Sequence, residues 1–153
     1  MRWLEHRIPP PIVCLLFGVL MWLVAGVSMR VPIPFQTRLG LALIWALAGI
    51  AIAMLGAQAF RRAQTTVNPL TPEAASSLVV AGIFRHTRNP MYLGLSSVLL
   101  GWAIYLAAPW ALLGPVLFAA YITRFQIIPE ERALAQNFGQ AFAGYCAQVR
   151  RWI

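Results

Sequence analysis

The 153-residue chain is 60% hydrophobic and 10% charged, with a mean hydropathy of +0.71. Soluble globular domains average about 45–50% apolar and about 25% charged residues, so this composition excludes an ordinary soluble domain and indicates a membrane protein. Twelve arginines against four acidic residues give a net charge of +8. Because the arginines flank apolar segments, their charge fits anionic lipid headgroups, and we expect no nucleic-acid partner.

Four apolar segments reach or approach the roughly 20 residues that a helix needs to cross a bilayer. We predict membrane spans at residues 12–29, 39–60, 91–107 and 110–128. The first resembles a signal peptide, because Arg2 and Arg7 precede it, but its length and the closely following second span favour a retained helix. The last contains Arg124, whose side chain can reach the interface if the helix ends there. The prediction is an all-α, integral membrane protein with a single domain covering 1–153.

The arginines determine the predicted orientation, because cytoplasmic loops carry an excess of positive charge. Arg30 and Arg38 lie between the first two spans, and the connection between the last two spans, 107–110, carries no charge. With both chain ends inside, every other arginine lies on the cytoplasmic side. We therefore predict a bacterial inner-membrane protein whose termini and second loop share the cytoplasmic face.

After the fourth span the pattern changes to that of an amphipathic helix. Apolar side chains recur at intervals of three or four residues, which is the period of one helix face. They are Leu134, Phe138, Phe142, Tyr145 and Val149. Pro129, Glu130 and Glu131 suit the first turn of this helix, where proline and acidic residues are favoured; the glutamates have the alternative role of capping charges. In the second loop, Thr71 can cap a short helix that begins at Pro72.

Two polar clusters are predicted to meet at the cytoplasmic face. The uncharged turn makes the last two spans antiparallel, so the start of the third lies near the end of the fourth. This brings together Arg85, Arg88, Asn89, Tyr92, Glu130 and Glu131. Such a mixture suits a zwitterion such as S-adenosylmethionine, whose carboxylate needs an arginine and whose ammonium and ribose need carboxylates or carbonyls. It suits a metal less well, and Cys14 and Cys146 offer no zinc or redox pair.

Two segments carry a family resemblance. Residues 78–94 read LVVAGIFRHTRNPMYLG and residues 121–134 read YITRFQIIPEERAL, followed by Phe138-Gly139, Tyr145 and Val149-Arg150-Arg151. Together they resemble the isoprenylcysteine carboxyl methyltransferase family and its relatives, the phospholipid N-methyltransferases. The resemblance covers about residues 65–153, which would form the cofactor-binding part of the domain.

The resemblance implies a membrane methyltransferase that binds S-adenosylmethionine in a cytosol-facing pocket, with a lateral opening for a lipophilic acceptor. It assigns cofactor binding to Arg88, Asn89, Pro90, Tyr92, Gly94, Glu130, Glu131, Phe138 and Tyr145. Two departures matter. Many members have histidine where this chain has Asn89, which puts a mechanism with an imidazole there in doubt. The Gly-x-Gly of phosphatidylethanolamine methyltransferases is also missing near Gly82, which favours another branch.

The implied chemistry is in-line transfer of a methyl group from sulfonium to a sulfur, oxygen or nitrogen nucleophile, accelerated by orientation and exclusion of water. A carboxylate or thiolate acceptor needs no base, whereas an amine or phenol must lose a proton. We assign catalytic roles to Arg85, Arg124 and Glu131; the two arginines suit either an anionic acceptor or phospholipid headgroups. The acceptor stays open. The alternatives are an inactive family member, a non-enzymatic four-helix protein or a transporter.

Overall fold

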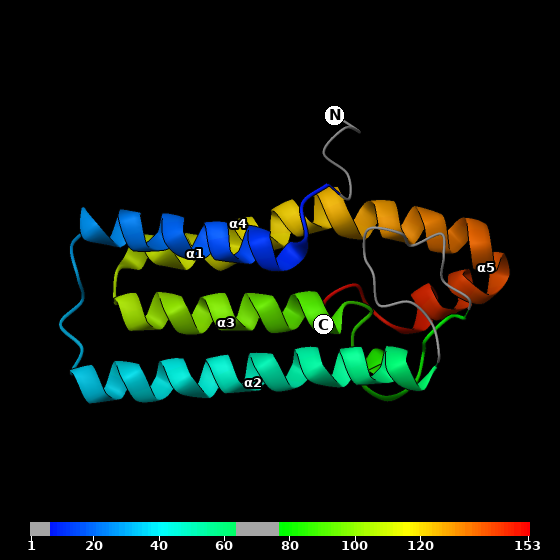
Figure 1. Ribbon diagram of the computed structural model, residues 1–153, viewed down its shortest axis with the longest axis horizontal. Coiled ribbons are helices and arrows are strands. Elements are labelled where there is room, and N and C mark those ends of the chain that lie inside the picture. The colour runs from blue at the N-terminus through cyan, green and yellow to red at the C-terminus, as the bar shows by residue number, and fades with distance from the viewer. Residues whose placement is uncertain (1–6, 64–76) are drawn as a thin grey trace.

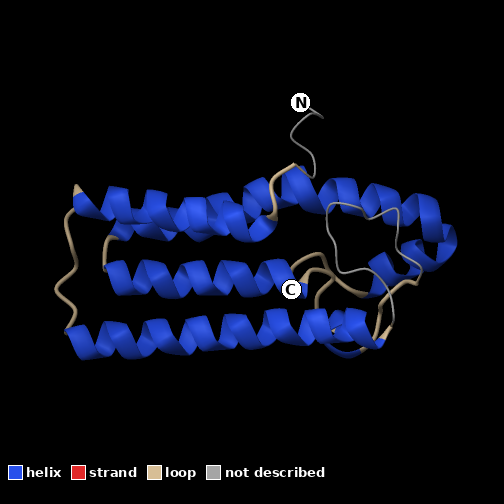
Figure 2. Ribbon diagram, in the orientation of Figure 1, coloured by secondary structure: helices blue, strands red, loops and turns tan. Residues whose placement is uncertain are grey.

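The computed structural model describes residues 7–63 and 77–153. Over these residues the chain is helical and makes four antiparallel passes (Figure 1), and Figure 2 shows helices and loops only. The elements are α1 (Pro10–Gly26), α2 (Phe35–Arg62), η3 (Gly82–Arg85), α3 (Pro90–Leu106), η4 (Pro109–Leu112), α4 (Leu113–Ile122), η5 (Thr123–Ile127) and α5 (Ile128–Gln148). The all-α prediction is confirmed for this part of the chain; the helix predicted at Pro72 lies outside it.

α3 lies at the centre of the bundle, with α2 on one side and α1 and α4 on the other (Figure 1). Glycines bring the backbones of α2 and α3 together, because a Cβ atom on Gly49 would lie 2.5 Å from the carbonyl oxygen of Gly94. Small residues at such contacts are typical of helices that pack in membranes. On the opposite side of α3, larger side chains form the core, and Met21, Leu99 and Phe118 are at most 3% exposed.

Two helical runs are long and apolar enough to cross a membrane, namely α2 and the run from Pro109 to Gln148. α1 and α3 have 17 residues each and are shorter. Large apolar side chains such as Leu15, Ile44 and Val116 are more than half exposed on the outside of the bundle. Soluble monomers rarely expose many such side chains together, so the bundle is suited to a membrane. That all four passes cross it stays a prediction.

The predicted spans and the observed helices differ at their ends. α1 begins and ends earlier than the predicted 12–29, because Pro10 occupies its first turn and the apolar residues Val27 and Met29 follow its end. α2 extends beyond 39–60 at both ends, since hydropathy does not detect the polar residues of its first and last turns. α3 agrees with 91–107 to within one residue.

The predicted start of the last helix at Pro129 agrees with α5, which begins at Ile128 and has Pro129, Glu130 and Glu131 in its first turn. No gap precedes α5, however, because one helical run continues from Pro109 to Gln148. Proline inside an α-helix lacks an N–H donor, and its ring collides with the carbonyl four residues earlier. The wider π-helical turn η5 removes this conflict just before the proline: the Ile128 N–H donates to the Thr123 carbonyl, five residues earlier. The apolar part of the run ends at Ile128, so Glu130 and Glu131 follow the segment that could cross a membrane.

The chain bends sharply inside α5 at Gly139, where φ is 47° and ψ is −117°. This conformation is accessible to glycine and strained for other residues. The bend returns the last turns of α5 toward the bundle (Figure 1). As a result, all five residues of the predicted apolar stripe join one hydrophobic cluster with Phe60 and Phe84. The stripe is therefore confirmed as a packing face, but on a bent helix.

Candidate functional site

Three segments distant in sequence meet at one end of the bundle. They are the start of α3 with the residues before it, the first turn of α5, and the C-terminal residues after α5. Proline fixes the start of α3, since Pro90 occupies its first turn and is buried. The two predicted clusters are therefore brought together by the fold, and the C-terminus joins them.

The charged part of the site is an Arg-Glu-Arg cluster. Glu131 accepts hydrogen bonds from Arg88, with Nη2 to Oε1 at 2.6 Å, and from Arg151, with Nη2 to Oε2 at 2.7 Å and Nε to Oε1 at 3.1 Å. The side chains of Arg88 and Glu131 are 12% and 19% exposed, whereas that of Arg151 is 38% exposed. Burial alone raises the pKa of Glu131, but the bonds from Arg151 and Arg88 outweigh it and leave the pKa below its ordinary value.

The residues before α3 also bind the backbone of the C-terminal segment. Arg88 Nη1 donates to the carbonyl of Val149 at 2.7 Å, and its backbone N–H donates to that of Arg150 at 3.1 Å. The Asn89 amide donates to the carbonyl of Arg151 at 2.8 Å. Asn89 thus acts as a clamp on the chain end. Arg151 and these carbonyls were missed as site groups; for Arg151 the signal was the matching Arg150-Arg151 at the end of the resemblance, and for the backbone carbonyls there was none.

The second glutamate has a different environment. The Tyr92 hydroxyl donates a short hydrogen bond to Glu130 Oε1, and Tyr92 itself is 4% exposed. Burial raises the pKa of the Glu130 carboxyl to about 8; the bond from Tyr92 opposes this rise and the adjacent charge of Glu131 adds to it. The two neighbouring carboxyls therefore differ in acidity: the pKa of Glu131, between its arginines, is lowered, and that of Glu130 is raised.

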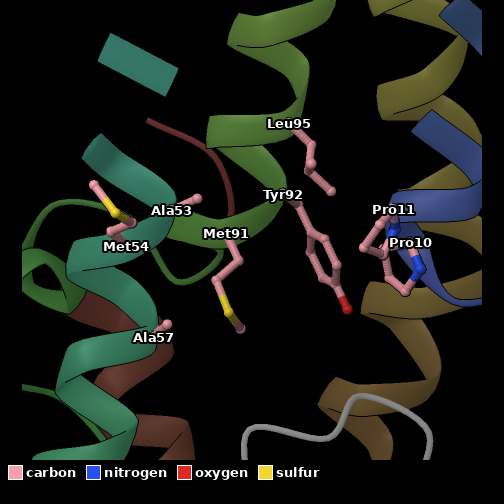
Figure 3. Close-up of a pocket in the computed structure, with 8 residues that line it drawn as sticks. All are labelled: Pro10, Pro11, Ala53, Met54, Ala57, Met91, Tyr92 and Leu95. Atoms are coloured by element: carbon pink, nitrogen blue, oxygen red, sulfur yellow. The ribbon is translucent and has the colours of Figure 1, made fainter. Parts of the chain in front are cut away.

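Tyr92 also lines a cavity of about 400 Å³ between α1, α2 and α3. Figure 3 shows Pro10 and Pro11 on one side, residues of α2 on the other, and Tyr92 between them. Apart from the Tyr92 hydroxyl, the lining side chains are apolar: Pro10, Pro11, Ala53, Met54, Ala57, Met91 and Leu95. Met54 is 61% exposed on the outer face of α2. The cavity therefore borders the apolar outer face of the bundle and reaches the Tyr92–Glu130 pair.

The other predicted site residues lie elsewhere. Gly94 faces Gly49 in the contact between α2 and α3. Phe138 and Tyr145 belong to the hydrophobic cluster beneath η3, and the Tyr145 hydroxyl donates to the carbonyl of Phe84 at 2.7 Å. Burial raises the pKa of Tyr145 to about 12, so it stays a neutral donor. Their predicted cofactor contacts stay predictions.

Two of the three predicted catalytic residues are on the surface. The Arg85 side chain is exposed at the end of η3, and that of Arg124 is exposed with its guanidinium 5.4 Å from the ring centre of Phe125. Neither residue lines the cavity. Their proposed contact with an anionic acceptor or a headgroup stays a prediction. Among the described residues, no three side chains of the metal-binding types are grouped closely enough to hold an ion.

A family model described as phospholipid methyltransferase matches residues 35–141, more than two thirds of the chain. The chain belongs to this family of methyltransferases. Family membership confirms the resemblance seen in residues 78–94 and 121–134, and the matched region contains α2, α3, and the Tyr92–Glu130 pair. The branch within the family stays a prediction.

One relative, a protein of Haemophilus influenzae described as uncharacterized, is 41% identical over 63 residues, which is 41% of this chain and all of that protein. No solved structure matches the chain. Neither comparison names an acceptor.

Proposed function

We propose that this family member is an S-adenosylmethionine-dependent methyltransferase that modifies a lipophilic acceptor at a membrane. The observation that carries the proposal is the meeting of two chemically different regions at adjacent glutamates. Glu131 lies in a cluster of two arginines, and Glu130 binds Tyr92 at the wall of an apolar cavity. A polar, charged cofactor and an apolar acceptor need such neighbouring sites.

The charged residues suit the amino-acid end of the cofactor. Arginine binds carboxylates through paired hydrogen bonds, and a glutamate suits an ammonium or ribose hydroxyls. Within the described part of the chain, Arg88 Nε is buried and makes no hydrogen bond, whereas Nη1 and Nη2 are bonded. Arg88 and Glu131 would hold the polar end of the cofactor, with Arg151 as the more exposed partner of Glu131.

When bound, the cofactor supplies an electrophilic methyl group on a positively charged sulfur. The protein then needs mainly to orient and desolvate the reactants. The ring of Tyr92 is buried beside the cavity. A cation–π contact between this ring and the cofactor's sulfonium would be shielded from bulk water, and desolvation strengthens such contacts. The C-terminal segment accepts hydrogen bonds from Arg88 and Asn89. These bonds keep the two side chains in place before the start of α3.

The proposed membrane arrangement has four crossing passes with both chain ends at the cytoplasmic face. Antiparallel α1, α2, α3 and the α4 to α5 run support it, since the polar site lies at the start of α3 and just after the apolar part of the α4 to α5 run. The positive-inside pattern of the arginines supports the same orientation. The site would then face the cytosol, where the cofactor is available, and the cavity would face lipid.

Calorimetric titration of the protein in mild detergent with S-adenosylmethionine and S-adenosylhomocysteine tests the function. We expect saturable binding of both and a loss of at least about tenfold in affinity for Arg88→Lys and Glu131→Gln, because each removes a charge-assisted contact. Arg150→Ala is the matched control, since that side chain is exposed and only its backbone binds Arg88. A folded wild-type protein that binds neither compound would indicate an inactive or non-enzymatic family member.

A further inference from the structure

The cavity beside Tyr92 differs from the charged cluster in one property that restricts the acceptor. None of the described side chains that line it is cationic, and its one polar group is the Tyr92 hydroxyl. Bringing an unpaired carboxylate into such surroundings is costly. Arg85 and Arg124, the arginines predicted to hold an anionic acceptor, do not line it. The cavity therefore favours an acceptor whose reacting end is uncharged.

An uncharged acceptor still carries its proton, which must leave during methyl transfer. The Tyr92 hydroxyl stands between the cavity and Glu130, to which it donates a hydrogen bond. In Figure 3 the tyrosine ring lies across the cavity wall, and its oxygen marks the polar end of an otherwise apolar space. Glu130 is thus connected to the cavity through one hydrogen-bonded hydroxyl, which is the geometry of a proton relay.

The two adjacent glutamates are suited to different tasks. Glu131 is fixed as an anion by Arg88 and Arg151, so it cannot readily take up a proton. Glu130, on α5, accepts a hydrogen bond from Tyr92 on α3. Glu131 is its neighbour in the sequence, and the hydrogen bonds of Arg88 and Arg151 go to Glu131. Environments that separate the protonation of two neighbouring carboxyls are typical of acid–base sites. With a pKa of about 8, Glu130 is partly ionised between pH 7 and 8, and its carboxylate form is the one that can take up a proton.

Resting on the proposed function, we propose that the acceptor is an uncharged phenol or thiol on an apolar body, and that Tyr92 and Glu130 relay its proton. In the step, a lone pair on the acceptor oxygen or sulfur forms the bond to the methyl carbon, and the carbon–sulfur bond of the methyl sulfonium donor breaks toward sulfur. The acceptor proton passes to the Tyr92 oxygen while the tyrosine proton passes to the Glu130 carboxylate. The products are the methylated acceptor, the neutral thioether and protonated Glu130.

The first test measures binding of an acceptor probe without turnover. A long-chain alkylphenol and a fatty acid of the same chain length are titrated into the protein with S-adenosylhomocysteine bound. We expect the alkylphenol to bind at least about tenfold more tightly than the fatty acid, and Ala57→Trp, which fills the cavity, to weaken the alkylphenol without changing S-adenosylhomocysteine affinity. Equal binding of phenol and carboxylate would show a plain apolar groove and overturn the assignment of the acceptor.

The second test follows the proton. Infrared spectroscopy of the wild-type protein should show a protonated carboxyl band that disappears as the pH rises through about 8 and is absent in Glu130→Gln. In single turnovers with the alkylphenol or a long-chain thiol, Tyr92→Phe and Glu130→Gln should each lower the rate about 100-fold, in the range of general base catalysis. The double variant should lose little more, since the two residues act in series.

The outcomes separate the relay from the function itself. If Tyr92→Phe binds S-adenosylmethionine as the wild type does and transfers methyl at the wild-type rate, the relay is wrong and the methyltransferase function stands. If only the fatty acid is methylated, the neutral acceptor is wrong and the function stands. If the folded wild type binds neither S-adenosylmethionine nor S-adenosylhomocysteine, both proposals fail.

Discussion

Arg151 binds the carboxylate of Glu131 through two hydrogen bonds, from Nε at 3.1 Å and from Nη2 at 2.7 Å, although twenty residues separate them. This paired contact joins the chain end to the first turn of α5. Arg88 binds the same carboxylate from the segment before α3. Glu131 therefore joins three separate segments, and its loss should destabilise the fold more than the loss of Arg151, its more exposed partner.

Replacing Glu131 should destabilise the fold more than replacing Arg151. Glu131→Ala leaves Arg88, which is 12% exposed, without its counter-ion, and breaking a mostly buried ion pair costs about 3–5 kcal/mol. Arg151→Ala removes a 38% exposed side chain, for which solvent screening limits the loss to about 1 kcal/mol. Denaturant unfolding in mild detergent measures both free energies. Equal losses would mean that the cluster is screened by solvent throughout.

Glu130 should make stability depend on pH. Its folded-state pKa of about 8 exceeds the ordinary value of 4.5, so the folded protein binds the extra proton between these values. Stability is then greatest below the ordinary pKa and falls as the pH rises to about 8, by at most about 1.4 kcal/mol per pH unit. Glu130→Gln should flatten this dependence between pH 5 and 8. Glu131, whose pKa is lowered, acts in the opposite sense and only at more acidic pH.

Hydropathy and motif spacing predicted the class of the fold and the two halves of the site, because both depend on local sequence. The hydropathy pattern located α2 and α3. The antiparallel connection predicted between the last two spans then placed Tyr92 and Glu130 at the same face of the membrane. The pair's hydrogen bond could not be foreseen, since its formation depends on the rotation of α5 relative to α3. That rotation is set by the π-helical turn η5, which changes the register of every residue after it.

The course of the C-terminus was also beyond sequence reasoning. An amphipathic stripe predicts which residues share a face but not where a helix bends, and the bend at Gly139 requires a backbone conformation that only the structure reveals. The carbonyls that bind Arg88 and Asn89 belong to backbone groups, which carry no residue-type signal. Arg88 was therefore assigned to a cofactor without its second role in holding the chain end.

The close contact of α2 and α3 gives a prediction about packing. A Cβ atom on Gly94 would collide with the carbonyl oxygen of Gly49 and with Ala53, so Gly94→Ala must push the helices apart. Overpacking of this kind costs about 1–3 kcal/mol. Gly144→Ala in α5 is the matched control, because nothing lies within 4 Å of its added Cβ and alanine favours a helix. Thermal unfolding in detergent should show a lower midpoint for the first variant only; unchanged midpoints for both would contradict the contact.

Asn89 gives a prediction about the histidine that the resemblance implies for many family members at this position. Asn89 is 9% exposed, and its side-chain amide donates to the Arg151 carbonyl, a task that an imidazole N–H can also perform. Asn89→His should therefore keep both stability and cofactor affinity within a few fold. Asn89→Leu has similar size but no donor, and the unsatisfied carbonyl should cost about 1–3 kcal/mol.

Unfolding titrations and cofactor binding on the two Asn89 variants distinguish a clamp from a catalytic group. If the histidine variant matches the wild type in stability and in the rate of methyl transfer, the position holds the chain end and an imidazole is not required. If Asn89→His raises the transfer rate while stability stays constant, and Asn89→Leu leaves stability intact, the residue acts on the reaction instead. The first result would explain how an asparagine serves at a position where the resemblance implies histidine in many members, because the shared requirement would be a hydrogen-bond donor.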